Sequence, residues 1–128
     1  MSNKFTVEII TPISSILKSE ATEVTIPAYE GEMGILKDHI SLITFLRPGL
    51  ISIKNQEEKK YYVEEGTVEY SKDNLLILTS TVKELSSLDK NFIDNLLNQA
   101  ENRLNNEFKD KERYLLTHKI NTLKEISQ

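Results

Sequence analysis

The sequence contains no cysteine, and only four glycines and three prolines occur among its 128 residues. Without cysteine, disulfide bonds and thiolate metal sites are excluded. The sequence also lacks an apolar run of the roughly 18 residues that a membrane-spanning helix requires. Its first residues lack the apolar stretch of a signal peptide. We therefore expect a small, soluble protein.

The sequence also lacks an excess of basic residues. It has 16 Lys and Arg against 20 Asp and Glu, which gives a net charge of −4. Proteins that bind nucleic acid usually carry a basic surface, so nucleic acid is not expected among the partners. Residues 1–87 carry the net charge of −4, whereas the charges of residues 88–128 balance. Hydrophobic residues make up 38% of the chain, which is enough for one modest core.

The glycines and prolines are unevenly distributed, since all of them lie at or before Gly66. Glycine and proline mark turns and strand ends, and both disfavour the interior of a helix. The distribution therefore predicts short strands in the first part of the chain and helix in the last part.

Apolar and polar side chains alternate in the first part, as they do in half-buried strands. Phe5, Val7 and Ile9 form one such pattern, and residues 21–26 form another, which we expect Pro27 to end. Further strands are predicted at residues 42–46, 50–54, 60–64, 67–70 and 75–79. Many short strands with closely spaced turns are typical of a sandwich or barrel.

The apolar period changes near Ser86. From Leu88 to Leu104 an apolar residue recurs at every fourth position, which predicts one face of an α-helix. Ser86 or Ser87 is the expected N-cap, with Asp89 in the first turn.

A second apolar stripe, from Tyr114 to Ile126, predicts a second helix. We expect the two helices at about residues 88–104 and 110–126, with a bend in the polar residues 105–109. The chain then divides into a β head, residues 1–85, and a helical tail, residues 86–128. The fold class is α+β with a mainly β head, and we expect the tail to form an antiparallel two-helix hairpin. The sequence also permits one continuous helix of about 58 Å, at 1.5 Å per residue.

The sequence contains two histidines, which are candidate metal ligands or acid–base groups. His39 lies near Glu30, Glu32 and Asp38, which suggests a metal or acid–base cluster. A metal site needs several converging ligands, so an ordinary polar turn or a partner contact is the favoured interpretation. His118 lies in the second predicted helix, and we interpret it as a solvated helix residue.

Motifs of enzyme catalysis are missing. The sequence contains neither a Gly-x-Ser-x-Gly nucleophile motif nor a glycine-rich phosphate loop with its lysine. No set of nucleophile, base and orienting group can be named, so we expect a protein that is not an enzyme.

Four basic residues of the tail alternate with acidic ones: Arg103, Lys109, Lys111 and Arg113. Ion pairs on a helix surface, worth roughly 0.2–0.5 kcal/mol each, are one interpretation, and the charge pattern alone favours it. A basic patch for an acidic partner is the other.

Residues 26–39, which read Ile-Pro-Ala-Tyr-Glu-Gly-Glu-Met-Gly-Ile-Leu-Lys-Asp-His, give a more specific signal. They resemble a hallmark segment of the epsilon subunit of F-type ATP synthases, Pro-x-x-Glu-Gly-(Glu/Asp)-x-Gly-(Ile/Val)-Leu-Pro-x-His. The resemblance begins at residues 7–12, continues through residues 41–49, and extends over the last hairpin and the tail. The chain departs from the family at Lys37-Asp38, where the family usually has Pro-Gly, and at Glu65-Gly66, where Gly-Gly is frequent.

The resemblance implies a head that is a β-sandwich of about ten strands. In the family this head joins the central stalk, contacts the gamma subunit and meets the polar loops of the membrane c-ring. Carried over by motif, Glu30, Gly31 and Glu32 would lie at the c-ring face and His39 near gamma. Gly31 and Gly34 would supply the backbone freedom of the turn.

The resemblance also implies a role for the tail. Packed on the head, the tail would leave rotation free, whereas extended along the stalk it would inhibit ATP hydrolysis by contacting acidic loops of the alpha and beta catalytic subunits. Arg103, Lys109, Lys111 and Arg113 would supply these contacts.

Some family members bind ATP through (Ile/Leu)-Asp-x-x-Arg-Ala on the first tail helix. This chain keeps Ile93 and Asp94 but lacks the Arg and the Ala, so no cofactor is expected and ATP binding has no support. The resemblance thus implies a non-catalytic subunit, not a homo-oligomer. It would be peripheral to the cytoplasmic side of the bacterial inner (plasma) membrane or to the equivalent organelle membrane. The alternative is a free-standing β-sandwich binding protein with a ligand or metal site between Glu30 and His39.

Overall fold

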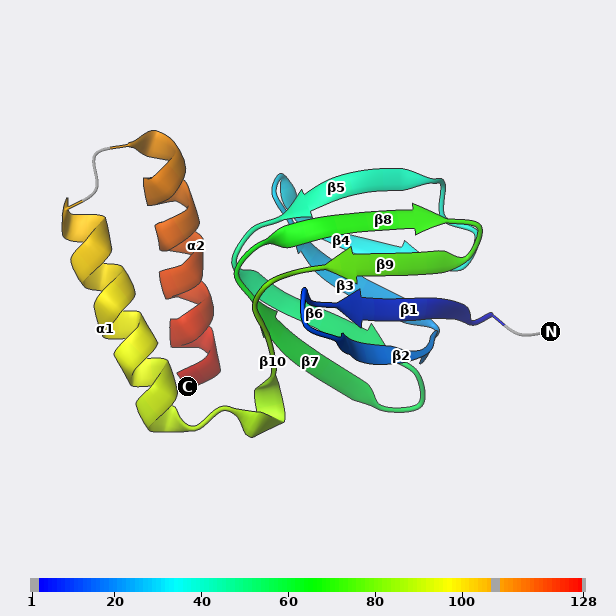
Figure 1. The fold of residues 1–128 in the computed structure, drawn as a ribbon, viewed down its shortest axis with the longest axis horizontal. Coiled ribbons are helices and arrows are strands. Elements are labelled where there is room, and N and C mark those ends of the chain that lie inside the picture. The colour runs from blue at the N-terminus through cyan, green and yellow to red at the C-terminus, as the bar shows by residue number, and fades with distance from the viewer. Residues whose placement is uncertain (1–2, 107–108, 128) are drawn as a thin grey trace.

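A computed structural model describes residues 3–106 and 109–127. A β head stands beside a hairpin of two helices, and the first strand begins at the end of the head away from the helices (Figure 1). The strands of the described residues are β1 (Phe5–Ile10), β2 (Ser15–Ala21), β3 (Glu23–Ala28), β4 (Gly31–Leu36), β5 (Leu42–Leu46), β6 (Gly49–Lys54), β7 (Glu58–Val63), β8 (Gly66–Ser71), β9 (Asn74–Leu78) and β10 (Val82–Glu84). The helices are α1 (Lys90–Asn106) and α2 (Asp110–Ser127), preceded by a short 3-10 helix, η1 (Leu85–Ser87).

The ten strands form one sheet that folds over itself into two layers. Their order is β10-β7-β6-β3-β5-β8-β9-β1-β2, with β4 paired to the other edge of β3. Only the β1–β9 pair is parallel among the pairs of the described residues. The layers meet at β3, which pairs with β6 through Thr25 and with β5 at Ala28. This confirms the predicted β-sandwich of about ten strands followed by two helices.

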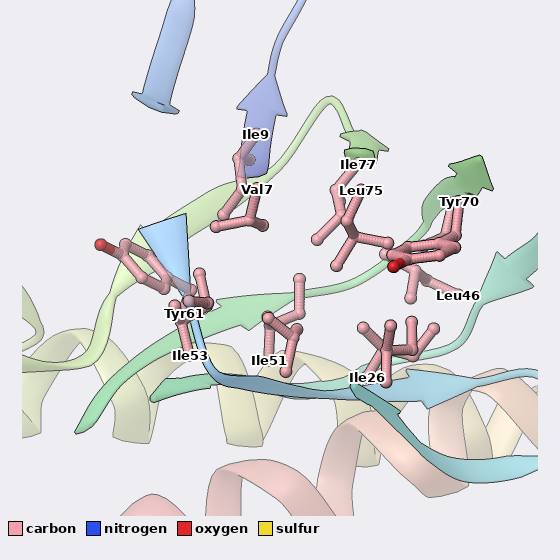
Figure 2. Close-up of a cluster of buried hydrophobic side chains, with 14 of the residues drawn as sticks. Val7, Ile9, Ile26, Leu46, Ile51, Ile53, Tyr61, Tyr70, Leu75 and Ile77 are labelled. Atoms are coloured by element: carbon pink, nitrogen blue, oxygen red, sulfur yellow. The ribbon is translucent and has the colours of Figure 1, made fainter. Parts of the chain in front are cut away.

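Alternation along the strands builds the core between the layers (Figure 2). On β1, Phe5, Val7 and Ile9 are buried, while the residues between them face outward. The opposite layer contributes buried side chains that include Ile26, Ile51, Ile53 and Tyr61. Each large apolar side chain buried here stabilises the head by about 1.5–3 kcal/mol.

The strands β2, β4 and β10 were not identified from the apolar pattern. β2 and β10 lie at the two ends of the strand order, and β10 has only three residues. Burial alternates along β2, but its apolar residues do not follow the alternation, because Ile16 is exposed and Ser19 lies on the inner side. β4 contains two glycines, a residue type that marks turns in a sequence, yet it pairs with β3 along its whole length.

The prediction that Pro27 ends its strand was wrong, because β3 continues to Ala28. The Pro27 carbonyl accepts a hydrogen bond from the Arg47 backbone N–H, at 3.0 Å. β3 pairs with β6 up to Thr25 and with β5 at Ala28, so Pro27 lies between the two pairings. Its lack of a backbone N–H therefore removes no hydrogen bond from either ladder.

The N-cap prediction for the first tail helix was also wrong. Ser87 belongs to η1, and its hydroxyl donates to the Glu84 carbonyl at 2.7 Å. The cap is Asp89, whose Oδ1 accepts the Phe92 backbone N–H at 2.7 Å. The helix therefore begins at Lys90, after the η1 turn.

The tail forms the antiparallel hairpin rather than one continuous helix (Figure 1). Along it, Ala100 of α1 packs against Leu116 and Ile120 of α2. Of the predicted bend, residues 107–108 lie outside the described residues. Neither α1 nor α2, as far as they are described, has the length and apolar character needed to cross a membrane.

Candidate functional site

The tail packs on the outer face of the layer that contains β3, β6 and β7 (Figures 1 and 2). On this layer Ile51 and Tyr61 point into the core, so their neighbours Leu50 and Tyr62 point outward. Leu50 and Tyr62 pack with Ile93 of α1 and Leu123 of α2. The interface is therefore a second, smaller apolar cluster, and its head residues would face water if the tail left.

Polar contacts along α2 fix its position on the head. The Tyr114 hydroxyl donates a hydrogen bond to the carbonyl of Tyr29, and the two rings stack with centroids 5.0 Å apart. Farther along, the Thr122 hydroxyl lies 3.4 Å from the carbonyl of Pro48. These contacts tie α2 to the β3–β4 turn and to the β5–β6 turn.

An ion pair completes this interface. The Lys119 ammonium lies 2.9 Å from the Glu64 carboxylate, and the Tyr62 hydroxyl donates to the same carboxylate at 2.9 Å. Burial, and then the charge of Glu64, raise the pKa of the Tyr62 hydroxyl. Tyr62 therefore stays protonated near neutral pH and keeps its role as the donor.

We expect Tyr114→Phe to weaken tail docking, because the Tyr29 carbonyl would lose its donor. One such hydrogen bond contributes about 0.5–1.5 kcal/mol, so the ratio of undocked to docked tail should rise about two- to tenfold. Amide hydrogen exchange in α2 measures this ratio. Thr117→Ala on the exposed face of the same helix is the control, and equal exchange in the two variants would contradict the docking role of Tyr114.

The structure separates the acidic group, Glu30, Gly31 and Glu32, from His39. Glu30 lies in the β3–β4 turn, and Gly31, with φ of 144°, begins β4. His39 follows the far end of that six-residue strand, which at about 3.3 Å per residue spans roughly 20 Å. The residues predicted as one turn therefore lie at opposite ends of a strand.

His39 has its own surroundings. Its ring packs edge-on against Tyr70, with centroids 5.8 Å apart, and its Nδ1 lies 2.8 Å from the Ile40 carbonyl. Burial and the neighbouring Asp73 raise the pKa of Tyr70 to about 12. Across residues 3–106 and 109–127, no group of three or more His, Asp or Glu could hold a metal ion. A joint ligand site of Glu30 and His39 is not formed.

Gly34 does not have the turn role proposed for it. It lies inside β4, opposite Thr25 of β3, and its φ is not in the left-handed region. Gly31 does have a positive φ, and it begins the strand where the β3–β4 turn ends. Of the two glycines, Gly31 alone needs the backbone freedom of the residue type.

The four tail cations gather near the tip of the helical hairpin. Arg103 lies in the last turn of α1, Lys109 immediately precedes α2, and Lys111 and Arg113 follow in its first turn. All four are exposed. The Arg113 guanidinium donates to the Leu104 carbonyl at 2.9 Å, so this residue also holds the two helices together.

The interpretation of His118 as a solvated residue was wrong. Its ring is half-buried and packs edge-on against Tyr114, with centroids 4.5 Å apart. Burial, and then the nearby charge of Arg47, lower the pKa of His118. Arg47 and His118 are far apart in the sequence and share a cleft only when α2 docks, so no local pattern could have revealed this pair.

The outer face of the other layer carries exposed apolar side chains. Ile43 is 72% exposed, Phe45 63% and Leu78 44%. The strand register places Phe45 beside Thr67, Thr67 beside Leu78, and Leu78 beside Ile10. We call Ile10, Ile43, Phe45 and Leu78 the apolar stripe. Thr67 separates Phe45 from Leu78, and Glu69 lies beside Ile43. A group of exposed apolar side chains of this kind is typical of a protein interaction site.

An open groove of about 860 Å³ continues the stripe toward the tail. Phe45, Leu78 and Ile10 line it on the head, and Lys111 and Leu115 line it on α2. One side of the groove therefore belongs to the tail and exists only while α2 is docked.

Comparisons with family models and with curated proteins point to the same family. A model of the β-sandwich domain of the ATP synthase delta/epsilon chain matches residues 4–84. The chain is 48% identical over 130 residues to the ATP synthase epsilon chain of Pelagibacter ubique (strain HTCC1062), covering 99% of this chain and 100% of that one. It is 32% identical over 98 residues to the epsilon chain of Hydrogenobaculum sp. (strain Y04AAS1), covering 77% and 72% of the two chains.

Solved structures share the fold at low sequence identity. A chain of the Euglena gracilis mitochondrial ATP synthase structure (OSCP/F1/c-ring) has a TM-score of 0.82 and 18% identity, covering 100% of this chain and 84% of that chain. A chain of the Tetrahymena thermophila mitochondrial ATP synthase structure (central stalk/c-ring) has a TM-score of 0.65 and 13% identity, covering 96% of each. The arrangement of β head and helical tail is thus an established one.

Proposed function

This chain belongs to the epsilon subunit family of the F-type ATP synthases, and we propose that it is a non-catalytic rotor subunit of the central stalk. The apolar stripe is the main observation that supports a position within a complex. The tail covers the outer face of one layer of the head, while Ile43, Phe45 and Leu78 stay exposed on the other. A partner subunit that covers the stripe would remove this apolar surface from water.

We assign the stripe to the gamma subunit. His39 lies beyond the end of β4, just before β5, the strand that carries Ile43 and Phe45. A gamma contact over β5 could therefore extend to His39. The proposed c-ring contact is Glu30, Gly31 and Glu32, at the other end of β4. Both carboxylates are exposed and suit the polar loops of a membrane ring.

We propose that the tail regulates ATP hydrolysis. The docked hairpin is the state that leaves rotation free. In the extended state, the exposed cations Arg103, Lys109, Lys111 and Arg113 would reach acidic loops of the alpha and beta catalytic subunits. The small apolar cluster and the few polar contacts of the docked interface favour a reversible switch, because a competing surface could replace them.

The proposed location follows from the complex. Through gamma and the c-ring, the chain would be peripheral to the cytoplasmic side of the bacterial inner membrane or to the equivalent organelle membrane. We propose no nucleotide site, because Ile93 of the partial ATP motif is used in packing the tail on the head.

Copurification with gamma tests the proposal. The wild-type chain is expected to form a stable one-to-one complex with the gamma subunit of the same organism. Phe45→Glu combined with Leu78→Glu should weaken the complex at least about a hundredfold, because two carboxylates would be buried in an apolar contact. Calorimetric titration of purified gamma measures the affinity.

Phe92→Glu is the matched control. Phe92 is a large apolar residue that is 37% exposed, but it lies on α1 rather than on the stripe. Its replacement should leave the affinity for gamma within about threefold of wild type. If the wild-type chain did not bind gamma, the rotor assignment would fail, and a free-standing binding protein would become the better explanation.

A further inference from the structure

Three aromatic rings form a row where α2 meets the head. Tyr29, from the β3–β4 turn, stacks on Tyr114, and Tyr114 packs edge-on against His118 one helical turn farther along α2. The His118 ring is half-buried and borders a polar cleft of about 310 Å³ between α2 and the β3–β6 surface. The imidazole therefore loses part of its water when the tail docks.

We propose that docking of the tail is controlled by protonation of His118, with the neutral imidazole permitting docking and the imidazolium favouring release. The tail then carries a proton-sensitive latch, in which one residue that titrates near neutral pH sits inside a reversible interface. The docking equilibrium is a property of this chain alone. The consequence for ATP hydrolysis rests on the proposed function.

The charges that share the cleft with His118 come from several elements. They are Glu32 of β4, Arg47 of the β5–β6 turn, Lys54 of β6, Glu58 and Lys60 of β7, and Glu125 of α2. Lys54 and Lys60 lie 3.5 and 3.8 Å from Glu58, which offsets one of the two lysine charges. All three residues are exposed, so water screens the one positive charge that remains. Glu32 and Glu125 are exposed, and water screens their effect on the imidazole.

Arg47 is the exception among these groups. It is half-buried, and its Nε is buried without a hydrogen-bond partner among the described residues. A protonated His118 beside this guanidinium would be repelled by it. In a partly buried cleft, water screens this repulsion only weakly. On α2 itself, the adjacent Lys119 is already paired with Glu64, so its charge is balanced.

The direction of the pH effect follows from these surroundings. In the docked state, burial first and Arg47 second lower the pKa of His118. In the released tail the ring returns to water, where a histidine titrates near about 6.5. The released state therefore binds more protons, and docking weakens as the pH falls through about 6.5. Above about pH 7.5 both states are neutral and docking does not change with pH.

The absence of cysteine allows a direct distance measurement on the full chain. Spin labels at Glu20→Cys in β2 and Gln99→Cys in α1 would report the separation of head and tail, since both positions are exposed. Between about pH 8 and about pH 5.5, the ratio of released to docked tail is expected to rise on acidification. A single proton limits the rise to tenfold per pH unit.

Two histidine variants distinguish the proposed role of His118 from a non-specific effect of low pH on docking. His118→Gln should remove the rise while the tail still docks at high pH, whereas His39→Gln should keep it, because His39 packs on Tyr70 far from the tail. Arg47→Met should reduce the rise, because it removes the neighbouring cation. An unchanged pH response in His118→Gln would overturn the proposal.

An NMR titration of the wild-type histidines is independent of any variant. The His118 midpoint is expected below about 6.5, and a midpoint at or above this value would overturn the latch. Both measurements use the chain without gamma or the catalytic subunits. Failure of the latch would therefore leave gamma binding intact, and failure of gamma binding would leave the latch intact.

Discussion

Replacing Gly66 with alanine is expected to destabilise the β head by about 2–5 kcal/mol, a large share of the 5–15 kcal/mol that is typical of a domain. Gly66 begins β8 opposite Leu46 of β5, and its φ is +156°. A Cβ there would lie 2.5 Å from the carbonyl oxygen of Leu78 and 3.1 Å from Leu46 Cδ1. Because the closest obstacle is backbone of the neighbouring strand, it cannot move aside without breaking the β8–β9 pairing.

Thermal unfolding followed by circular dichroism measures this effect, and a loss on the order of 10 °C in Tm is expected. Gly34→Ala is the matched control, since nothing lies within 4 Å of its added Cβ and its φ is ordinary. Similar melting temperatures for the two variants would show that the sheet adapts at Gly66 and would contradict this prediction.

The second large effect concerns the tail. Changing Arg103, Lys109, Lys111 and Arg113 together to alanine in the assembled ATP synthase should weaken inhibition of ATP hydrolysis about tenfold or more. Each exposed ionic contact is worth up to roughly 1 kcal/mol, and four of them act on one surface. Hydrolysis rates at several salt concentrations would measure the change, and the wild-type inhibition should itself fall as salt screens the contacts.

Arg113 needs separate treatment, because its bond to the Leu104 carbonyl holds the helical hairpin together. A triple variant that keeps Arg113 distinguishes loss of partner contacts from loss of tail structure. Lys18, Lys59 and Lys90, changed together to alanine, remove the same charge from exposed positions elsewhere. If hydrolysis and its inhibition were the same in all these enzymes, the tail cations would have no inhibitory role.

The sequence by itself determined the division into a β head and a helical tail and the positions of seven of the ten strands of the described residues. Alternation at Phe5, Val7 and Ile9 predicted which side of β1 is buried, because side chains alternate across a strand whatever it pairs with. The change to a four-residue period after Ser86, with no glycine or proline beyond Gly66, predicted the tail helices for the same local reason. The glycine-containing segment at residues 26–39 also identified the family, because its residue types are unusual in combination.

Only the tertiary structure decided what the elements touch. β2 and β10 are edge strands with few buried apolar side chains, and being an edge is a property of the whole sheet. Glu30 and His39 are near in sequence but are held apart by β4, whereas Arg47 and His118 are distant in sequence and share a cleft. The local pattern states which face of an element is apolar, but it does not name the surface that will cover that face. Long-range packing therefore decided that Leu50 and Tyr62 lie under the tail while Ile43 and Phe45 stay exposed.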